Sequence, residues 1–344
     1  MAFAVLARSP DRPSADRVEQ PPCPVFGRWP QRGAQPDRAC GGCQWQHVRY
    51  GAQAAYKRAM VVDALERIGR LEAPAVAETL AMSKPWGYRN RLTVQWNEFG
   101  PCLVAADGRS AVPVTACPIA HPLHAELLEL LEPQPGVGIE AILRAGVGTG
   151  DQMLVLRDPA GSIEELDIDT QASVILVGPG GTQVAAGRPY LVERLAGRSF
   201  LVPPESFFQV NSEMAEQLVR LVREAVPPGT GLLVDAFAGV GTFGLSVADR
   251  AREVVAIESD AAAVAAAVEN AVGMPNITLI EGSAVEGLES LSEAPDALIV
   301  DPPRAGLPRG LHTYLERRRP PTIIYVSCEP STLARDAGRL SEIS

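Results

Sequence analysis

Hydrophobic and polar positions follow different periods in successive parts of the chain. In residues 53–70 the apolar residues recur at helical spacing: Val61, Leu65 and Ile68 share one face, and Gly69 follows as a stop. Residues 88–201 instead contain short alternating or β-branched runs between Gly and Asp, which is typical of a small β-rich domain. Helical spacing returns in residues 210–226.

From Gly231 onward, strand and helix patterns alternate. Apolar runs ending in "VDAFAG", "VAIES", "TLIEG", "LIVDPPR" and "IIYVSC" are separated by stretches with helical spacing, one through Val247 and one through Ala271. This alternation predicts an α/β fold, a parallel sheet with helices on both faces. We therefore expect three parts: an N-terminal segment with a cysteine cluster and a helix (1–83), a central β-rich domain (84–205) and a Rossmann-like domain (206–344).

Composition and charge narrow the class of protein. The 344 residues are 46% hydrophobic, no run of about 18 apolar residues occurs, and the N-terminus lacks a secretory pattern. We expect a cytoplasmic protein without a membrane span. The net charge of −10 is uneven, because the first 100 residues hold 14 Lys and Arg against 9 Asp and Glu, and the remainder 17 against 32. A basic end on an acidic chain indicates nucleic-acid contact or a solvated surface.

The strand ends carry the candidate chemistry, because ligands of such sheets bind beyond the carboxyl ends of the strands. Asp235 ends one strand and is followed by Gly239 and Gly241, which let a ligand approach the backbone at a helix start. Glu258 ends the next strand, where a carboxylate can hold both ribose hydroxyls. The spacing predicts a cofactor that contains a nucleoside.

Two later apolar runs lead to further candidate residues. Asp301 ends the run "ALIV", and Cys328 follows the run "TIIYV". Arg304 in "DPPRAGL" either meets a phosphate or locks the turn. A lone cysteine is often a packing residue. At the ligand edge, however, a thiolate can add to C6 of a pyrimidine and make C5 nucleophilic enough to accept a methyl group.

Six motifs together resemble those of the bacterial RNA uracil-5-methyltransferases that use S-adenosylmethionine: "CGGCQWQH" (40–47), "WGYRNR" (86–91), "SFFQVN" (206–211), "DAFAGVGTF" (235–243), "DPPRAGL" (301–307) and "YVSCEP" (325–330). The resemblance implies that the final domain is a methyltransferase domain with Cys328 as the nucleophile. By matching position it implies five cofactor-binding residues: Gln209, Phe237, Thr242, Glu258 and Asp301.

Other positions of these motifs are less regular. Phe208 and Asn211 lie in the same motif as Gln209 and are expected to shape the site. Ser283 stands where family members often have an acid near the adenine, and Glu329 stands where many have Asn.

The C-x-x-C pair at Cys40 and Cys43 predicts metal or redox chemistry in an intracellular protein. Zinc and an iron–sulfur cluster both accept four thiolates, and spacing does not separate them. The resemblance favours a 4Fe–4S cluster held by Cys23, Cys40, Cys43 and Cys117, although sixteen residues separate the first two, more than is usual in the family. It also points to ribosomal RNA as the substrate. Cys102 is expected to be a packing residue.

Two parts of the family pattern are not found. "AFAVLARSPDR" is at most the last strand of the N-terminal RNA-binding barrel, and the C-terminal glutamate that acts as the general base has no match, since neither Glu329 nor Glu342 fits its motif. We therefore expect a truncated, slow enzyme in which "TIIYVSC" is an exposed sheet edge.

The leading hypothesis is a monomeric enzyme that methylates uridine C5 in 23S ribosomal RNA. The alternatives are an RNA-binding remnant without activity, a tRNA uracil-5-methyltransferase, and an amino-group methyltransferase suggested by "DPPR".

Overall fold

The computed structural model describes residues 15–18, 20–26, 40–133, 138–161, 163 and 169–342. The expected last strand of the RNA-binding barrel, residues 2–12, lies outside them. So does the segment "WPQRGAQPDR" (29–38), which accounts for the long spacing between Cys23 and Cys40. Contacts divide the chain into two units, Met1–Ala55 with Leu80–Leu191 and Tyr56–Thr79 with Val192–Ser344. The division into 1–83, 84–205 and 206–344 stays a prediction.

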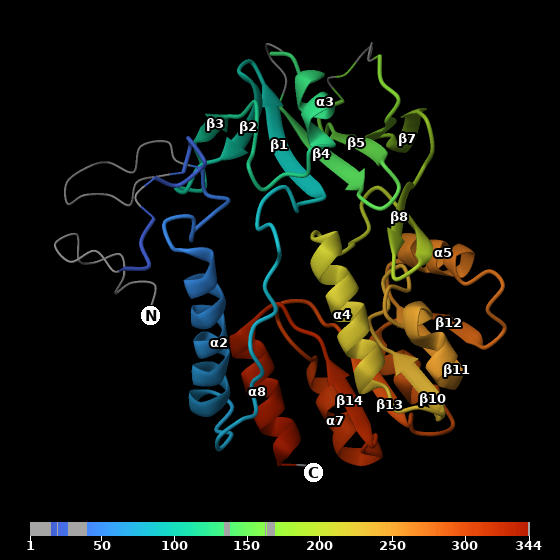
Figure 1. Cartoon of the computed structure of the whole chain (residues 1–344). Helices are drawn as coiled ribbons and strands as arrows, with labels where there is room; N and C mark the ends of the chain where they lie inside the picture. The colour runs from blue at the N-terminus through green and yellow to red at the C-terminus, as the bar shows by residue number, and fades with distance from the viewer. Residues whose placement is uncertain are drawn as a thin grey trace. The chain divides into compact units, whose positions relative to one another are not determined.

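The first unit is built on a seven-stranded sheet in the order β3-β2-β1-β4-β5-β6-β7 (Figure 1). Its neighbours are antiparallel except for the parallel pair β5 and β6. The strands are β1 (Arg91–Asn97), β2 (Gly100–Val104), β3 (Ala111–Pro113), β4 (Ile139–Gly146), β5 (Asp151–Arg157), β6 (Ser173–Gly178) and β7 (Gly181–Ala186), and a short helix, α3, covers His124–Glu129.

The alternating sequence of β1 explains how this sheet forms a core. Leu92, Val94 and Trp96 are buried while the residues between them are more exposed. Leu92 pairs with Leu143 of β4, which in turn pairs with Leu154 of β5. These side chains pack with Leu127 of α3. Residues 88–201 were predicted to be β-rich, and all seven strands of this sheet lie within them.

The second unit holds a five-stranded parallel sheet in the order β12-β11-β10-β13-β14. Its strands are β10 (Thr230–Asp235), β11 (Ala251–Glu258), β12 (Ile277–Glu281), β13 (Ala297–Val300) and β14 (Thr322–Tyr325). A separate two-stranded sheet joins β8 (Leu191–Leu195) and β9 (Arg198–Val202). The helices are α4 (Ser212–Ala225), η1 (Leu245–Arg250), α5 (Ala261–Asn270), α6 (Ala284–Glu289), α7 (Arg309–Arg318) and α8 (Pro330–Ser341).

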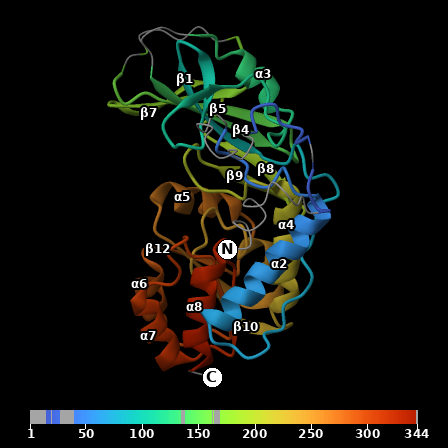
Figure 2. The ribbon, with the colours of Figure 1, turned by 90° about the vertical axis from the view of Figure 1, so that its left-hand side faces the viewer.

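Both faces of this parallel sheet are buried. Val234, Val255 and Leu298 form one cluster with residues of α6 and α7, two helices that lie side by side (Figure 2). The strand neighbours Leu233 and Val254 are also fully buried, and successive side chains point to opposite faces of a strand. The predicted α/β fold with helices on both faces is confirmed.

The helix predicted at 53–70 is α2 (Tyr50–Arg67), and its second half belongs to the second unit. Arg58 donates through its guanidinium to the carbonyl oxygen of Val76 at 2.8 Å, which holds the returning segment along the helix. Beyond the helix, Gly69 lies so close to α8 that a Cβ there would meet the carbonyl oxygen of Ala334 at 2.7 Å. This segment therefore packs on the helix that follows Cys328.

One predicted element differs. The stretch expected to be a helix through Val247 is a glycine-rich turn followed by the short 3-10 helix η1, because Gly239 (φ +55°) and Gly241 (φ +91°) adopt left-handed backbone that an α-helix excludes. In the described part of the chain, every helix is too short or too polar to cross a membrane.

Candidate active site

The carboxyl ends of four parallel strands bring the predicted residues to one edge of the second unit's sheet. Asp235 ends β10, Glu258 ends β11, Asp301 directly follows β13, and Cys328 comes three residues after β14. Since β13 lies between β10 and β14, the Asp301 position separates the glycine turn from the cysteine. The topology therefore creates an edge at which a nucleoside-bearing ligand and a nucleophile can meet.

The glycine turn after β10 is fixed by Glu258. The backbone N–H of Gly239 donates to Glu258 Oε2 at 2.8 Å, while Oε1 accepts from the N–H groups of Ser259 at 2.7 Å and Asp260 at 2.8 Å. A Cβ at Gly239 would meet nothing within 4 Å, so the turn is open there. The carboxylate is held in one orientation, and Oε2 retains acceptor capacity for a ribose hydroxyl.

Asp235 is a fully buried acid next to this turn. Its Oδ2 accepts from the Gly244 N–H at 2.8 Å, whereas Oδ1 has no hydrogen-bond partner among the described residues. Burial, with smaller contributions from the nearby Asp301 and Glu258, raises the pKa of Asp235 to about 7. An orphaned buried carboxylate oxygen fits a ligand with a positive charge or a strong donor.

Asp301 and Gln209 join segments 92 residues apart. The Gln209 side-chain amide donates to Asp301 Oδ2 at 3.5 Å, and burial raises the pKa of Asp301 to about 6. Asn211 caps α4 by accepting from the Met214 N–H at 3.1 Å. S-adenosylmethionine carries a sulfonium and an ammonium group beside its ribose, so this set of acids fits the cofactor.

The "SFFQVN" segment presents its two aromatic rings differently. Phe208 is buried against Phe200, with ring centroids 6.1 Å apart, whereas Phe207 is 64% exposed beside Gln209. The structure thus gives Phe208 a packing role. Phe207 was not singled out from the sequence, because an "FF" pair does not say which ring faces solvent.

Cys328 is exposed at the turn that joins β14 to α8. The turn is held by Ser327, whose hydroxyl accepts from the Glu329 N–H at 3.1 Å. Glu329 caps α8, and its carboxylate accepts from the Ser331 hydroxyl at 2.7 Å. These bonds, with a smaller contribution from Arg304, lower the pKa of Glu329. A carboxylate held in this way is poorly suited to accept a proton.

Three further predicted positions lie in the glycine turn or at the start of α6. Phe237 and Thr242 are half-buried in the glycine turn. Ser283 is the N-cap of α6, accepts from the Glu286 N–H at 3.2 Å and donates to the Glu286 carboxylate at 2.7 Å. Its hydroxyl is committed to the helix start.

The four predicted cysteine ligands lie near one another in the first unit. Cys23, Cys43 and Cys117 each act electrostatically on Cys40, and burial raises the pKa of both Cys40 and Cys43. The N–H of Gly42 donates to Cys40 Sγ at 3.3 Å. Nevertheless, within the described ranges no group of three or more Cys, His, Asp or Glu side chains has the arrangement of a metal site. The donor chemistry suits a metal or cluster, but the described arrangement does not reproduce such a site. Cys102 is fully buried in β2, in agreement with a packing role.

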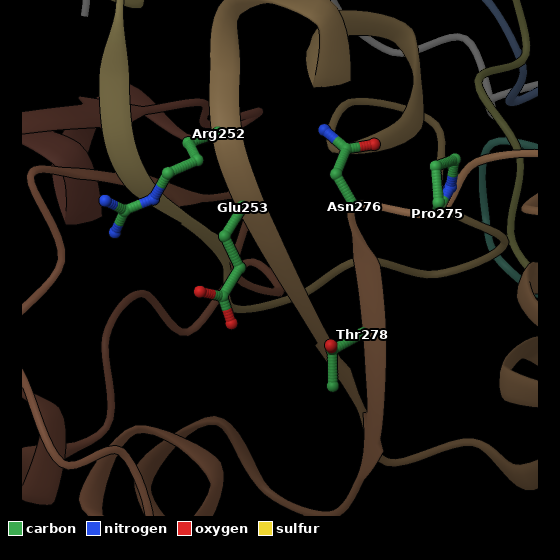
Figure 3. A pocket seen from close by; sticks show the side chains of 5 residues that line it. All are labelled: Arg252, Glu253, Pro275, Asn276 and Thr278. Atoms are coloured by element: carbon green, nitrogen blue, oxygen red, sulfur yellow. The ribbon is translucent and has the colours of Figure 1, made fainter.

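A surface pocket at the other end of the sheet is distinct from this edge (Figure 3). It is lined by Arg252 and Glu253 at the start of β11 and by Pro275, Asn276 and Thr278 around the start of β12. It contains one charge of each sign, and the Asn276 amide already donates to the backbone of Ala248 at 3.0 Å. Nothing there selects a cofactor.

Comparison with known proteins agrees with the geometry of the edge. The sequence model of the tRNA (uracil-5-)-methyltransferase family matches residues 164–344. An uncharacterized RNA methyltransferase of Thermosynechococcus vestitus is 36% identical over 96% of this chain and 79% of its own length, and one of Listeria innocua is 32% identical over 98% and 80%.

A solved structure extends the likeness to the fold. The Pyrococcus abyssi tRNA (uracil-54, C5)-methyltransferase in complex with S-adenosyl-L-homocysteine superposes with a TM-score of 0.71 at 28% identity, covering 89% of this chain and 81% of that one. With the strand-end acids, the glycine turn and the family match taken together, the chain belongs to the RNA uracil-5-methyltransferases of the tRNA (uracil-5-)-methyltransferase family.

Proposed function

We propose that the chain methylates C5 of a uridine in RNA through a covalent adduct with Cys328. The observation that carries the proposal is the exposure of Cys328 at the same sheet edge as the glycine turn, Glu258 and Asp301. The Cys328 thiolate forms a bond to C6, and the C5–C6 π electrons move toward the C4 carbonyl, which makes C5 nucleophilic. After C5 has gained the methyl group, transfer of the C5 proton to a base, such as a water molecule, lets the C5–H electron pair restore the C5–C6 double bond and releases the thiolate.

S-adenosylmethionine supplies the electrophilic methyl group and leaves as S-adenosylhomocysteine. Glu258 would hold the ribose hydroxyls with the acceptor capacity left on Oε2. Asp301, oriented by Gln209, would face the cationic end, and Phe237 and Thr242 would line the turn. We do not assign the C5 proton to Glu329, because its carboxylate caps α8 and its pKa is lowered.

We propose 23S ribosomal RNA as the substrate. The basic first 100 residues and the four cysteines, which in the resembling enzymes accompany ribosomal RNA substrates, support it. Transfer RNA is the second candidate, favoured by the description of the matching family and by the Pyrococcus abyssi enzyme. Methyl transfer to matched fragments of the two RNAs, measured at equal concentration, separates the candidates. A monomeric state and a cytoplasmic location complete the proposal.

We further propose that Cys23, Cys40, Cys43 and Cys117 bind a 4Fe–4S cluster. Their mutual electrostatic influence and the N–H donated to Cys40 Sγ support this, since thiolate clusters depend on such donors. Iron, sulfide and zinc analysis of anaerobically purified protein would test it. Zinc without sulfide would overturn the cluster and retain a metal site.

The first experiment combines RNA containing 5-fluorouridine with methyl-labelled S-adenosylmethionine, because fluorine at C5 blocks the final elimination. A labelled RNA–protein band on a denaturing gel, lost in Cys328→Ala, is the expected result. Folded protein that binds RNA without forming this band would support an RNA-binding remnant. Methylated RNA without any dependence on Cys328 would support an amino-group methyltransferase.

A further inference from the structure

Asp336 in α8 is a fully buried acid that the proposed chemistry does not use. Its side chain has no exposure, yet its carboxylate is the acceptor for hydrogen bonds from three other elements of the second unit. Buried carboxylates are costly unless they are paired and hydrogen-bonded. The hydrogen-bond partners of Asp336 therefore show which segments this buried carboxylate holds together.

The first partner is the loop that follows Asp301. The Leu307 N–H donates to Asp336 Oδ2 at 2.9 Å, and the neighbouring Arg335 donates to the carbonyl oxygen of Ala305 at 2.9 Å. Gly306 between them has φ +83°, and a Cβ there would collide with Asp336 Oδ2 and the Arg335 guanidinium. Residues 305–307 are thus bound to α8 at consecutive positions, which requires glycine in the middle.

The second partner is the strand that leads to the nucleophile. The Tyr325 hydroxyl, at the end of β14 and three residues before Cys328, donates to Asp336 Oδ2 at 2.9 Å. Burial and the adjacent Asp336 raise the pKa of Tyr325, so the phenol keeps its proton and remains a donor. Tyr325 precedes Cys328 in the sequence and Asp336 follows it. Their hydrogen bond therefore connects the two ends of the segment that contains Cys328.

The remaining partners balance the charge. Arg335 donates to Asp336 Oδ1 through Nε at 2.9 Å, and His312 Nε2 on α7 lies 3.3 Å from the same oxygen. Because an ionised carboxylate only accepts, the imidazole carries its proton on Nε2. The hydrogen bonds lower the pKa of Asp336 despite its burial, so the carboxylate is ionised.

We propose that Asp336 is a positioning residue that fixes the Cys328 turn relative to the loop carrying Asp301. The inference rests on the proposed function, in which the thiol and the methyl donor must meet at one uracil ring. A carboxylate that binds Tyr325, Leu307 and Arg335 at once links the nucleophile side of the edge to the cofactor side. Displacement of reacting groups by about 1 Å costs on the order of 100-fold in rate.

The test measures the rate constant and the amplitude of adduct formation on 5-fluorouridine RNA at saturating RNA and S-adenosylmethionine. Asp336→Asn keeps the shape but turns an acceptor into a donor among donors, and we expect a rate constant about 100-fold lower. Tyr325→Phe removes one hydrogen bond to a charged group and leaves the acid in place, and we expect a loss of about tenfold. The matched control is Asp249→Asn, which breaks an exposed pair with Arg223 and should change the rate less than about twofold.

A merely structural role would lower the amplitude, since fewer molecules would be folded, and leave the rate constant of the folded fraction unchanged. That result, or wild-type rate constants in both variants, would overturn the proposal. If Asp336→Asn does not fold, Tyr325→Phe decides. Amide hydrogen exchange gives a readout that needs no RNA: both variants should speed exchange in residues 305–307 and 326–329 while β10 and β11 keep their protection. Absence of adduct in the wild-type protein would overturn the proposed function, whereas unchanged exchange in the variants would overturn the role of Asp336.

Discussion

The two groups of candidate residues in this protein are positioned by different means. In the second unit, Asp235, Glu258 and Asp301 stand at the ends of neighbouring parallel strands. Asp235 pairs with Ala256 and Ile299, so the strand register sets Glu258 and Asp301 each two residues beyond the level of Asp235. In the first unit, Cys40 is placed by isolated bridges to Phe26 and Ala105 and by loop hydrogen bonds such as that from its N–H to the Val25 carbonyl at 2.9 Å.

This difference indicates which of the two sites needs a bound ligand to reach its final geometry. A sheet edge presents its acids before any cofactor arrives, because the buried strands define it. The cysteine loop, by contrast, would take its final geometry from the proposed cluster, since binding energy at such sites is folding energy. We therefore expect substitutions at the sheet edge to change chemistry, and substitutions in the cysteine loop to change metal content and local stability.

The largest effect is expected for Cys328→Ser. A hydroxyl at this position is a far weaker nucleophile, so methyl transfer should fall by about 10⁴-fold or more. Binding of S-adenosylmethionine should stay within about twofold, because Cys328 is exposed and follows β14, which β13 separates from the strand that leads into the glycine turn. Single-turnover methyl transfer and equilibrium dialysis check the two statements. An equal loss of methyl transfer in Cys43→Ser would contradict the expectation that cysteine-loop substitutions change metal content and local stability instead of the chemistry.

The next effect concerns Glu258→Gln. The variant keeps the side-chain shape but loses the charge that accepts from the Gly239 N–H and, in the proposed function, from the ribose. We therefore expect cofactor affinity to fall about 10- to 100-fold. Calorimetric titration with S-adenosylhomocysteine measures it. Glu281→Gln, at the end of the neighbouring β12, is the matched control and should bind normally. Unchanged affinity in Glu258→Gln would move the ribose site elsewhere.

A smaller effect is expected from pH. Asp301 and Asp235 have pKa values raised to about 6 and about 7, so both ionise as the pH rises through this range. Affinity for the cationic S-adenosylmethionine should increase over the same interval. Stability of the ligand-free protein should change in the opposite sense: the folded acids hold protons that the unfolded chain has already lost above pH 3.8, so unfolding becomes easier as the pH approaches 7. Thermal unfolding with and without cofactor at several pH values checks both signs. Parallel trends would contradict this assignment of charges.

The smallest effect is on stability. Gly241→Ala combines left-handed backbone with a clash, since the new Cβ would lie 2.5 Å from Leu245, and we expect a loss of about 2 to 4 kcal/mol. Gly229→Ala has a similar φ of +74° but meets nothing within 4 Å, so it reports the backbone strain alone, about 1 to 2 kcal/mol. Denaturant unfolding of both variants separates packing from strain. Equal losses of stability in the two variants would show that the Leu245 side chain moves aside for the new Cβ.

The fold class and the edge that carries the candidate chemistry follow from the sequence. Alternation of β-branched runs and helical stretches predicts a parallel sheet, and Asp235, Glu258, Asp301 and Cys328 come where the apolar runs stop, so they were expected at one edge. The same reasoning predicted a helix through Val247, and this was wrong, because positive φ angles at two glycines are invisible to hydrophobic periodicity.

Contacts between segments that are distant in the sequence became known from the fold. It distinguished buried Phe208 from exposed Phe207, brought Gly69, just after α2, against α8, and showed that one Asp235 oxygen has no hydrogen-bond partner among the described residues. It also assembled Asp336 with Tyr325 and Leu307, which no local pattern brings together. Periodicity reports which face of an element is buried, whereas hydrogen bonds across the fold depend on how whole elements pack, and that is set by the summed free energy of the core.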